Sequence, residues 1–358
     1  MTDDASIDEV ITERRGRLGL LTLNRPRAIN ALTHGMVRAI SRALDAWRDD
    51  SAVETVAVVG AGDRGLCAGG DVVTLYDDTT RGDGLGAAAF WRDEYAMNAA
   101  IASYPKPFVA VQDGIVLGGG IGVSAHGSHR VVTERSKLGF PEVTIGYIPD
   151  VGATWLLSRA PGEIGTRLAL SAETVGAADA ILVGFADSFV AGERIPDLLA
   201  ALEREEAGEV IALLSSEPPA GVLAEQRRWT DHAFSAESVE EIIERLHVVG
   251  SAEAALLAQT VASKSPLAEA VTLESLRRAR SLPDLESALE QEYRVSRHSS
   301  VSHDFAEGIR AQLIDKDRNP RWHPAAHADV TRAEVAAFFA EPADGDLVLT
   351  RQTSKETT

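Results

Sequence analysis

The chain has 358 residues, a formal net charge of −19 at pH 7 and a single cysteine. Its length predicts about two domains, and 45% hydrophobic and 25% charged residues exclude a disordered or fibrous protein. The negative charge disfavours binding to nucleic acid and to anionic membrane surfaces. No apolar stretch is long enough to span a membrane. One cysteine cannot form an internal disulfide and the first residues do not resemble a signal peptide, so the sequence predicts a cytoplasmic protein.

The first half of the chain alternates short strands with helical patterns. Short apolar runs, each followed by a turn, predict strands at residues 17–23, 55–59, 108–111 and 131–133. After Thr33, whose hydroxyl suits a helix N-cap, apolar residues recur at helical spacing from Met36 to Trp47. This alternation predicts the α/β class.

The character of the sequence changes near residue 196, after which long segments are rich in Ala, Leu, Glu and Arg. A helix begins at Ser265, an N-cap residue followed by proline, and continues through Leu276. The sequence predicts a core with the active site over residues 1–200, a helical region over 201–350 and a flexible tail over 351–358. The Pro-rich residues 217–221 are the expected joint.

Two glycine-rich segments follow predicted strands. In 65–71 (GLCAGGD), glycine lets the backbone approach a ligand and point its N–H groups at it. In 113–120 (DGIVLGGG), the glycines precede a probable helix, whose first N–H groups carry partial positive charge and suit an oxyanion. A surface turn and a tight strand-to-helix turn are the alternatives for these segments.

A third segment, residues 140–150, places Glu142 and Asp150 in an otherwise uncharged stretch bent by Pro and Gly. A carboxyl group in such an apolar pocket can act as general acid or base near neutral pH. Alternatively, Asp150 caps the following helix and Glu142 caps a turn.

Glu94 shares a predicted helix face with Phe90, Met97 and Ile101, so its side chain is expected to point inward. An edge position that reaches solvent is the alternative. Two further features are weaker. The pair of histidines at 126 and 129 resembles metal ligands only slightly, and no metal is predicted. Cys67 has no nearby base arranged to ionise it and is expected in the core.

Four motifs, in this order along residues 10–200, resemble the enoyl-CoA hydratase/isomerase (crotonase) superfamily. They are Asn24-Arg25-Pro26 with Asn30-Ala31-Leu32, Cys67-Ala68-Gly69-Gly70-Asp71, Asp113-Gly114 with Gly118-Gly119-Gly120, and Pro141-Glu142 with Ile145-Gly146. The resemblance implies a crotonase-like ββα spiral core followed by a C-terminal helical region. It also implies an oxyanion hole from the backbone N–H groups of Gly70 and Gly119, with Glu142 and Asp150 as catalytic carboxylates.

Within the superfamily, the chain is most similar to 3-hydroxyisobutyryl-CoA hydrolases. The similarity lies in residues 90–95 (FWRDEY), 149–152 (PDVG) and the late stretch 303–322. Hydratases of the superfamily carry a second catalytic Glu where this chain has Gly122. The resemblance therefore implies hydrolysis of a short β-hydroxyacyl-CoA thioester in valine catabolism, with the enoyl-CoA hydratase or isomerase reaction as one alternative. A non-catalytic acyl-CoA-binding protein is the other.

The same resemblance implies roles for individual residues. Glu142 either activates water or attacks the thioester directly, and Asp150 either positions the substrate hydroxyl or relays a proton to the thiolate. Glu94, Ala68 and Arg25 are implied to bind substrate, with Arg25 near the CoA phosphates. No cofactor is implied beyond the coenzyme A of the substrate itself, and a homo-oligomer, a trimer or another state, is expected.

Overall fold

The computed structural model describes residues 8–351. Its strands form two sheets. The larger, six-stranded sheet has the order β1-β2-β3-β4-β6-β9 and is parallel except for the β1–β2 pair, whereas the smaller has the order β5-β7-β8. The strands are β1 Val10–Arg15, β2 Leu18–Leu23, β3 Thr55–Gly60, β4 Phe108–Gln112, β5 Ile115–Leu117, β6 His129–Val132, β7 Lys137–Gly139, β8 Thr174–Val175 and β9 Ser188–Phe189.

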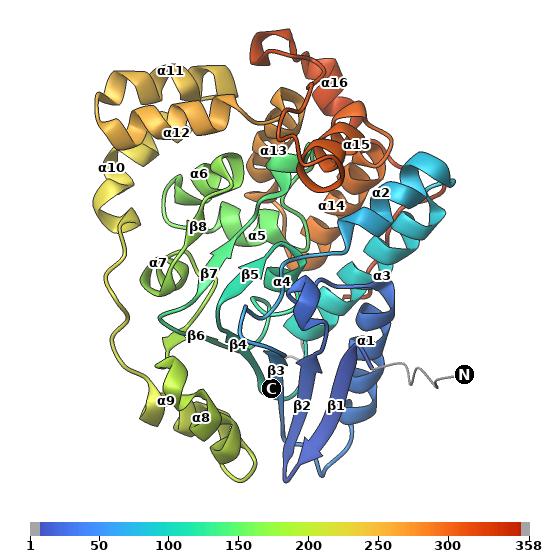
Figure 1. Cartoon of the computed structure of the whole chain (residues 1–358), viewed down its shortest axis with the longest axis vertical. Helices are drawn as coiled ribbons and strands as arrows, with labels where there is room; N and C mark the ends of the chain where they lie inside the picture. Colours follow the sequence, from blue (N-terminus) through green and yellow to red (C-terminus); the bar gives the residue numbers. More distant parts are fainter. Residues whose placement is uncertain (1–7, 352–358) are drawn as a thin grey trace.

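In the middle of the spiral, successive turns of the chain each supply one segment to each sheet and then a helix (Figure 1). After β3, Cys67 forms a parallel bridge to Val116 of β5, and helices α2 (Val72–Arg81) and α3 (Leu85–Ala102) follow. The next turn consists of β4, β5 and the short helix α4 (Gly119–Gly122). The predicted ββα spiral is therefore confirmed.

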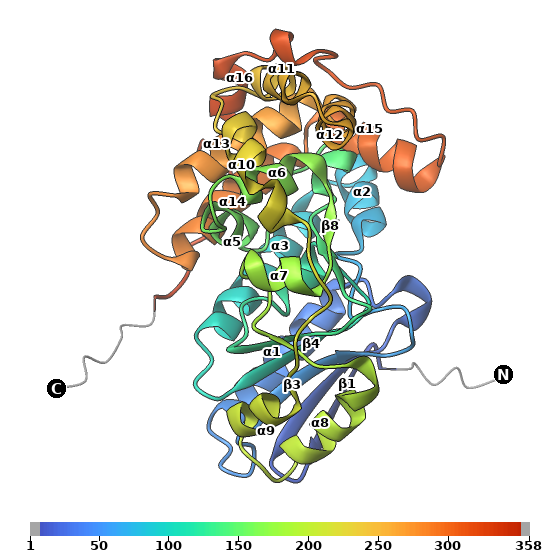
Figure 2. The ribbon, with the colours of Figure 1, turned by 90° about the vertical axis from the view of Figure 1, so that its left-hand side faces the viewer.

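The large sheet is covered on both faces, as its continuous apolar strands require. Leu21 and Leu23 belong to the main apolar cluster with α1 (His34–Arg48) and α3, whereas Leu18 and Leu20 pack with α8 (Ile195–Leu202) and α9 (Ala207–Leu214). This alternation is the two-residue period of a strand. Figures 1 and 2 show α1 on one side of the sheet and α8 and α9 on the other.

The remaining helices gather beyond one end of the large sheet (Figure 2). They are α5 Ala153–Ser158, α6 Ile164–Ser171, α7 Ala177–Leu182, α10 Leu223–Phe234, α11 Val239–Val249, α12 Ala252–Ala262, α13 Pro266–Ala279, α14 Leu285–Ser299, α15 His303–Ile309 and α16 Arg332–Ala337. Short 3-10 helices are η1 Pro26–Ala28, η2 Glu142–Ile145, η3 Gly192–Arg194 and η5 His327–Asp329, and η4 is a π-helix at Arg310–Ile314. In the described part of the chain, no helix is both long and apolar enough to cross a membrane.

The late helices share their core with the first half of the chain. Leu276 of α13, Leu289 of α14 and Phe305 of α15 belong to the same apolar cluster as Trp91 and Val151. The cluster therefore joins the spiral to the C-terminal helical region. The predicted division at residue 200 stays a prediction, as does the flexible tail, which from residue 352 onward lies outside the described residues.

The sequence signals for strands and caps match the structure closely. Thr33 Oγ1 accepts a hydrogen bond from Met36 N at 3.1 Å, and Ser265 Oγ accepts one from Ala268 N at 3.1 Å, so both predicted N-caps are confirmed. Strands β1, β5, β7, β8 and β9 were not predicted. Only Val10 of the β1 side chains is buried, so that strand carries no apolar pattern, and the other four strands have two or three residues each.

We expect Leu198→Ala to lower the free energy of unfolding by about 2–5 kcal/mol, because it opens a cavity between α8 and the sheet. Urea denaturation checks this. Leu213→Ala is the control, since Leu213 of α9 is 80% exposed, and it should change stability little. Equal effects of the two substitutions would contradict the packing of α8 and α9 on the sheet.

Candidate active site

One cavity of about 530 Å³ contains six of the seven residues to which the sequence assigns a role. It lies between the turns of the spiral and the segment around α15 and η4. Its lining includes Ala68, Gly70, Glu94, Gly119, Glu142 and Asp150, together with Trp91, Tyr147, Phe305, Gln312 and Arg318. Arg25 is the exception and does not line the cavity.

The backbone N–H groups of Gly70 and Gly119 are adjacent and unpaired. Gly69 O and Asp71 N both bond to the backbone of Leu32 in a parallel bridge, so the N–H of the residue between them points away from Leu32. Gly119 begins α4, where the first N–H groups have no partner within the helix. Among residues 8–351, neither N–H has an acceptor. A Cβ on Gly119 would lie 3.3 Å from Gly70 N, so both donors border the same point.

Glu142 opens η2, and its side chain is buried and makes no hydrogen bond to another side chain in the described part of the chain. Its Oε2 has no partner, and its Oε1 lies so close to Gly118 that a Cβ there would collide with it. Burial raises the pKa of Glu142 well above its ordinary value, and the negative charge of Asp150 raises it further. The chain therefore favours the neutral form of this carboxyl group in the empty cavity.

Asp150 is also buried, but it is hydrogen bonded. Its Oδ2 accepts from the hydroxyl of Tyr95 at 2.7 Å and from that of Tyr147 at 3.0 Å. Burial raises the pKa of Asp150 to about 6, while the two phenols act in the opposite direction. The alternative that its carboxylate caps the next helix is wrong, because α5 follows Gly152 without any side-chain cap.

The turn after Asp150 is held from two sides. Val151 has φ +56°, which is strained for a β-branched residue, and Gly152 has φ +83°. His126 Nε2 donates to the Val151 carbonyl at 2.7 Å, and Gly152 N donates to Glu292 Oε2 at 2.6 Å. Burial raises the pKa of Glu292 to about 8 against the effect of its donors, which include Thr154. These contacts fix the position from which the Asp150 side chain enters the cavity.

Glu94 points inward from α3, as expected, and the alternative of a solvent-exposed edge is wrong. Within residues 8–351 its Oε1 has no hydrogen bond partner. A Cβ on Gly119 would lie 2.9 Å from this oxygen, so the Glu94 carboxyl group borders the unpaired amides. Burial raises the pKa of Glu94 well above its ordinary value, and the charge of Asp150 adds to the effect.

Arg25 lies away from the cavity and is already engaged. Its guanidinium donates to the Ala31 carbonyl and pairs with Asp71 and Glu9, each at 3.1 Å. Its predicted contact with CoA phosphates stays a prediction. Arg318, which the sequence reasoning did not single out, is the arginine that lines the cavity, and it makes no ion pair among the described residues.

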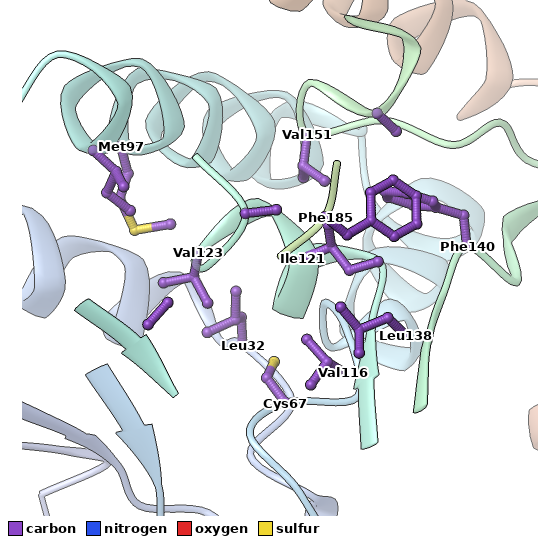
Figure 3. Packing of buried hydrophobic residues seen from close by; sticks show 14 of the residues in the cluster. Leu32, Cys67, Met97, Val116, Ile121, Val123, Leu138, Phe140, Val151 and Phe185 are labelled. Atoms are coloured by element: carbon purple, nitrogen blue, oxygen red, sulfur yellow. The ribbon is translucent and has the colours of Figure 1, made fainter. Parts of the chain in front are cut away.

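Cys67 is a buried core residue, as predicted, and Figure 3 shows it in the apolar cluster with Leu32 and Val116. Burial raises the pKa of its thiol to about 12. His129 Nδ1 lies 2.9 Å from Ser128 Oγ rather than near His126. The described part of the chain holds no group of three or more His, Cys, Asp or Glu side chains that could bind a metal ion.

Sequence reasoning also missed the groups that surround Asp150. Tyr147 lies inside the 140–150 segment and Tyr95 follows Glu94, so their proximity to predicted site residues was a usable signal. Ser296, whose Oγ lies 2.7 Å from Tyr95 Oη, is on α14, and a serine inside a polar helix gives no such signal.

Comparison with known proteins identifies relatives along almost the whole chain. The profile of the enoyl-CoA hydratase/isomerase family matches residues 18–339. The chain is 40% identical to 3-hydroxyisobutyryl-CoA hydrolase, mitochondrial, of Danio rerio, over 95% of this chain and 92% of that protein. It is 37% identical to the Homo sapiens protein of the same name, over 95% and 90% of the two chains. The predicted cytoplasmic location is not tested by these names.

Solved structures give the same fold under different names. A carnitinyl-CoA dehydratase from Mycobacterium thermoresistibile has a TM-score of 0.93 and 49% identity, covering 97% of this chain and 100% of that one. An enoyl-CoA hydratase from Rhodobacter sphaeroides 2.4.1 has a TM-score of 0.90 and 42% identity, covering 95% and 100%. The names therefore agree on acyl-CoA chemistry and disagree on the reaction. The profile match and these identities establish that the chain belongs to the enoyl-CoA hydratase/isomerase (crotonase) family.

Proposed function

We propose that this protein hydrolyses the thioester of a short β-hydroxyacyl-CoA, of the 3-hydroxyisobutyryl-CoA type, to the free acid and CoA, in valine catabolism. One observation carries the proposal: a single cavity combines two adjacent unpaired amides with two buried acids whose environments differ. The names of the curated relatives support the same reaction.

The thioester carbonyl oxygen binds between the N–H groups of Gly70 and Gly119. Both donors are in place before the substrate arrives, so they stabilise the tetrahedral oxyanion without rearrangement. Removal of one such donor costs roughly 3 kcal/mol of transition-state stabilisation. The apolar lining around the donors, which includes Trp91 and Phe305, excludes water and strengthens the interaction.

One proton passes between Glu142 and Asp150 during the reaction, so that each is in turn the acid and the base. Near neutral pH, Asp150 carries the charge, while burial keeps the proton on Glu142. The Glu142 proton passes to Asp150, and the Glu142 carboxylate then takes a proton from water, whose oxygen adds to the carbonyl carbon. When the C–S bond breaks, protonated Asp150 gives its proton to the thiolate, and the resting state is restored. Direct attack by Glu142, followed by hydrolysis of the anhydride, uses the same proton balance.

The hydratase reaction is the second candidate, because the two solved relatives are named as a dehydratase and a hydratase. By resemblance, hydratases place a second catalytic Glu at the position of Gly122. A Cβ on Gly122 would lie 2.6 Å from Val151 Cβ and 3.1 Å from Asn98 Nδ2. Because this space is filled, the second acid comes from Asp150 instead, and the arrangement favours hydrolysis over water addition.

The CoA portion carries phosphates, and Arg318 is the cation at the cavity that suits them. Glu94, beside the amides, either binds the substrate hydroxyl or influences the ionisation of the acid pair, since its charge raises the pKa of Glu142. The surroundings of Ala68 and Gly70 give the acyl group an apolar contact. A homo-oligomer stays a prediction.

The test is thiol release from two substrates. We expect the protein to release CoA thiol from 3-hydroxyisobutyryl-CoA and none from crotonyl-CoA, which it should leave unhydrated. Glu142→Gln should lower thiol release at least about 100-fold, while calorimetry still detects binding of the thioester. Hydration of crotonyl-CoA without thiol release would instead support the hydratase function. Turnover by Glu142→Gln at the wild-type rate would remove Glu142 from the mechanism.

We also expect kcat/KM for thiol release to decrease below a pH of about 6, the pKa of Asp150. Below this pH, Asp150 is protonated in the free enzyme and cannot receive the Glu142 proton, so the rate should fall about tenfold per pH unit. A pH–rate profile between pH 4.5 and 8 checks this, and it reports the apparent pKa of the interacting acids. A flat profile across pH 5–7 would contradict the role of Asp150.

Glu94→Gln should stabilise the fold increasingly as pH rises. The pKa of Glu94 is higher in the folded than in the unfolded protein. The contribution of Glu94 to folding stability is therefore complete below its unfolded-state pKa of about 4.3, and it is lost as the pH rises through its folded-state pKa. The Tm difference between the variant and the wild type should thus be small at pH 4.5 and larger at pH 8. Glu244→Gln, at an exposed residue of α11, controls for the lost charge. A difference that shrinks with pH would show that Glu94 is stabilised as an anion.

A further inference from the structure

Asp150 is surrounded by a buried hydroxyl cluster, which we define as Tyr95, Tyr147 and Ser296. Its three members come from α3, from the segment after η2 and from α14. All three side chains are buried. The cluster therefore joins the spiral to the C-terminal helical region at the side chain of a proposed catalytic acid.

The contacts within the hydroxyl cluster are short and shared. Both phenols contact Asp150 Oδ2, and both also contact Ser296 Oγ, at 2.7 Å from Tyr95 Oη and 2.5 Å from Tyr147 Oη. Ser296 Oγ also lies 2.8 Å from the carbonyl oxygen of Glu292. Because both phenols donate their hydrogens to Asp150, the single serine hydrogen can be donated to one phenol oxygen or to this carbonyl.

This arrangement constrains one carboxylate oxygen and leaves the other available. Oδ2 receives both phenol hydrogen bonds, whereas Oδ1 has no hydrogen bond to another side chain in the described part of the chain. Asp150 lines the cavity, so the oxygen without a side-chain donor is the one that a bound acyl group can meet. Without the phenols, the side chain would be free to rotate in a site that works only at defined geometry.

We propose that Tyr95 and Tyr147, which both lie against Ser296, are positioning residues for Asp150 and that they aim its second oxygen at the substrate. The expected effect of these phenols on thiol release rests on the proposed function. Their effect on the position of the Asp150 side chain rests on the contacts alone. The phenols donate to the carboxylate, so they also favour its charged form.

Three further ionisable side chains face Asp150, and its negative charge raises the pKa of each. They are Glu94 from α3, Glu142 from η2 and Glu292 from α14, and all three are acids. The imidazole of His126, which donates to the Val151 carbonyl, is kept neutral because burial lowers its pKa to about 4. The hydroxyl cluster therefore supplies the side-chain hydrogen bonds that keep Asp150 ionised near neutral pH.

Tyr95→Phe is the principal test, because Tyr95 touches Asp150 without lining the cavity. We expect kcat for thiol release to fall about tenfold or more with KM little changed. The acidic limb of the pH–rate profile should move upward by about one pH unit, since loss of a donor raises the pKa of Asp150. Tyr147→Phe should have the same sign, with an additional effect on KM because Tyr147 lines the cavity.

Tyr293→Phe is the matched control. Tyr293 is a buried tyrosine of α14 whose hydroxyl accepts from Arg92 at 2.8 Å, away from Asp150. It should lower stability without moving the pH limb. If Tyr95→Phe lowers kcat but leaves the acidic limb of the pH–rate profile in place, the phenol contributes only to packing. If Tyr95→Phe leaves the kinetics unchanged, the phenol has no role in the reaction. Either result overturns the inference.

A measurement without substrate separates this inference from the proposed function. In protein labelled with 13C-aspartate, the carboxyl resonance of Asp150, assigned by its loss in Asp150→Asn, should titrate at higher pH in Tyr95→Phe than in wild type. If wild type releases no thiol but this titration shifts, the proposed function fails and the positioning stands. If wild type is active and the titration does not shift, the positioning is wrong.

Discussion

The site depends on two backbone N–H groups that the fold leaves without acceptors. A buried, unpaired donor costs free energy, and here two of them, at Gly70 and Gly119, lie together at the wall of a cavity. Their lack of acceptors follows from topology. The bridge to Leu32 uses the residues on either side of Gly70, and Gly119 is the first residue of a helix. In the proposed reaction, a substrate oxygen satisfies both donors, so the cost to the fold becomes binding energy in the complex.

Beside these donors, the chain buries acids without a matching number of bases. Burial raises the pKa values of Glu94, Glu142, Asp150 and Glu292, and the donors around them decide how they differ. Oε2 of Glu142 has no hydrogen bond partner among the described residues, whereas Oδ2 of Asp150 accepts from two phenols. Two acids held in unlike surroundings can exchange a proton near neutral pH, which two acids in equal surroundings do less effectively. The helix α14 supplies part of this difference, so the C-terminal region belongs to the chemistry as well as to the core.

The sequence predicted those parts of the site whose residues lie within one short segment of the chain. The glycine-rich turns, the acids of residues 140–150 and the inward face of α3 each lie within a short segment, and the structure brings them into one cavity. The partners of Asp150 were not predictable in the same way, because Ser296 is 146 positions away and nothing in the α14 sequence marks it. Arg25 was assigned to substrate on its motif, but Asp71 and Glu9, which engage it, come from other segments.

The turn at Val151 connects fold to specificity in the proposed reaction. Its side chain occupies the space beside Gly122, Figure 3 shows it in the apolar cluster that also contains Ile121, and its backbone delivers Asp150 to the cavity. A Cβ on Gly122 would lie 2.6 Å from Val151 Cβ, so a larger side chain at this position of α4 does not fit beside the turn. The left-handed backbone conformation of Val151 is strained for a β-branched residue. The hydrogen bonds from His126 and to Glu292 hold the turn in this conformation. In the reaction proposed for this chain, the second acid therefore comes from the wall of the cavity that carries this turn rather than from α4.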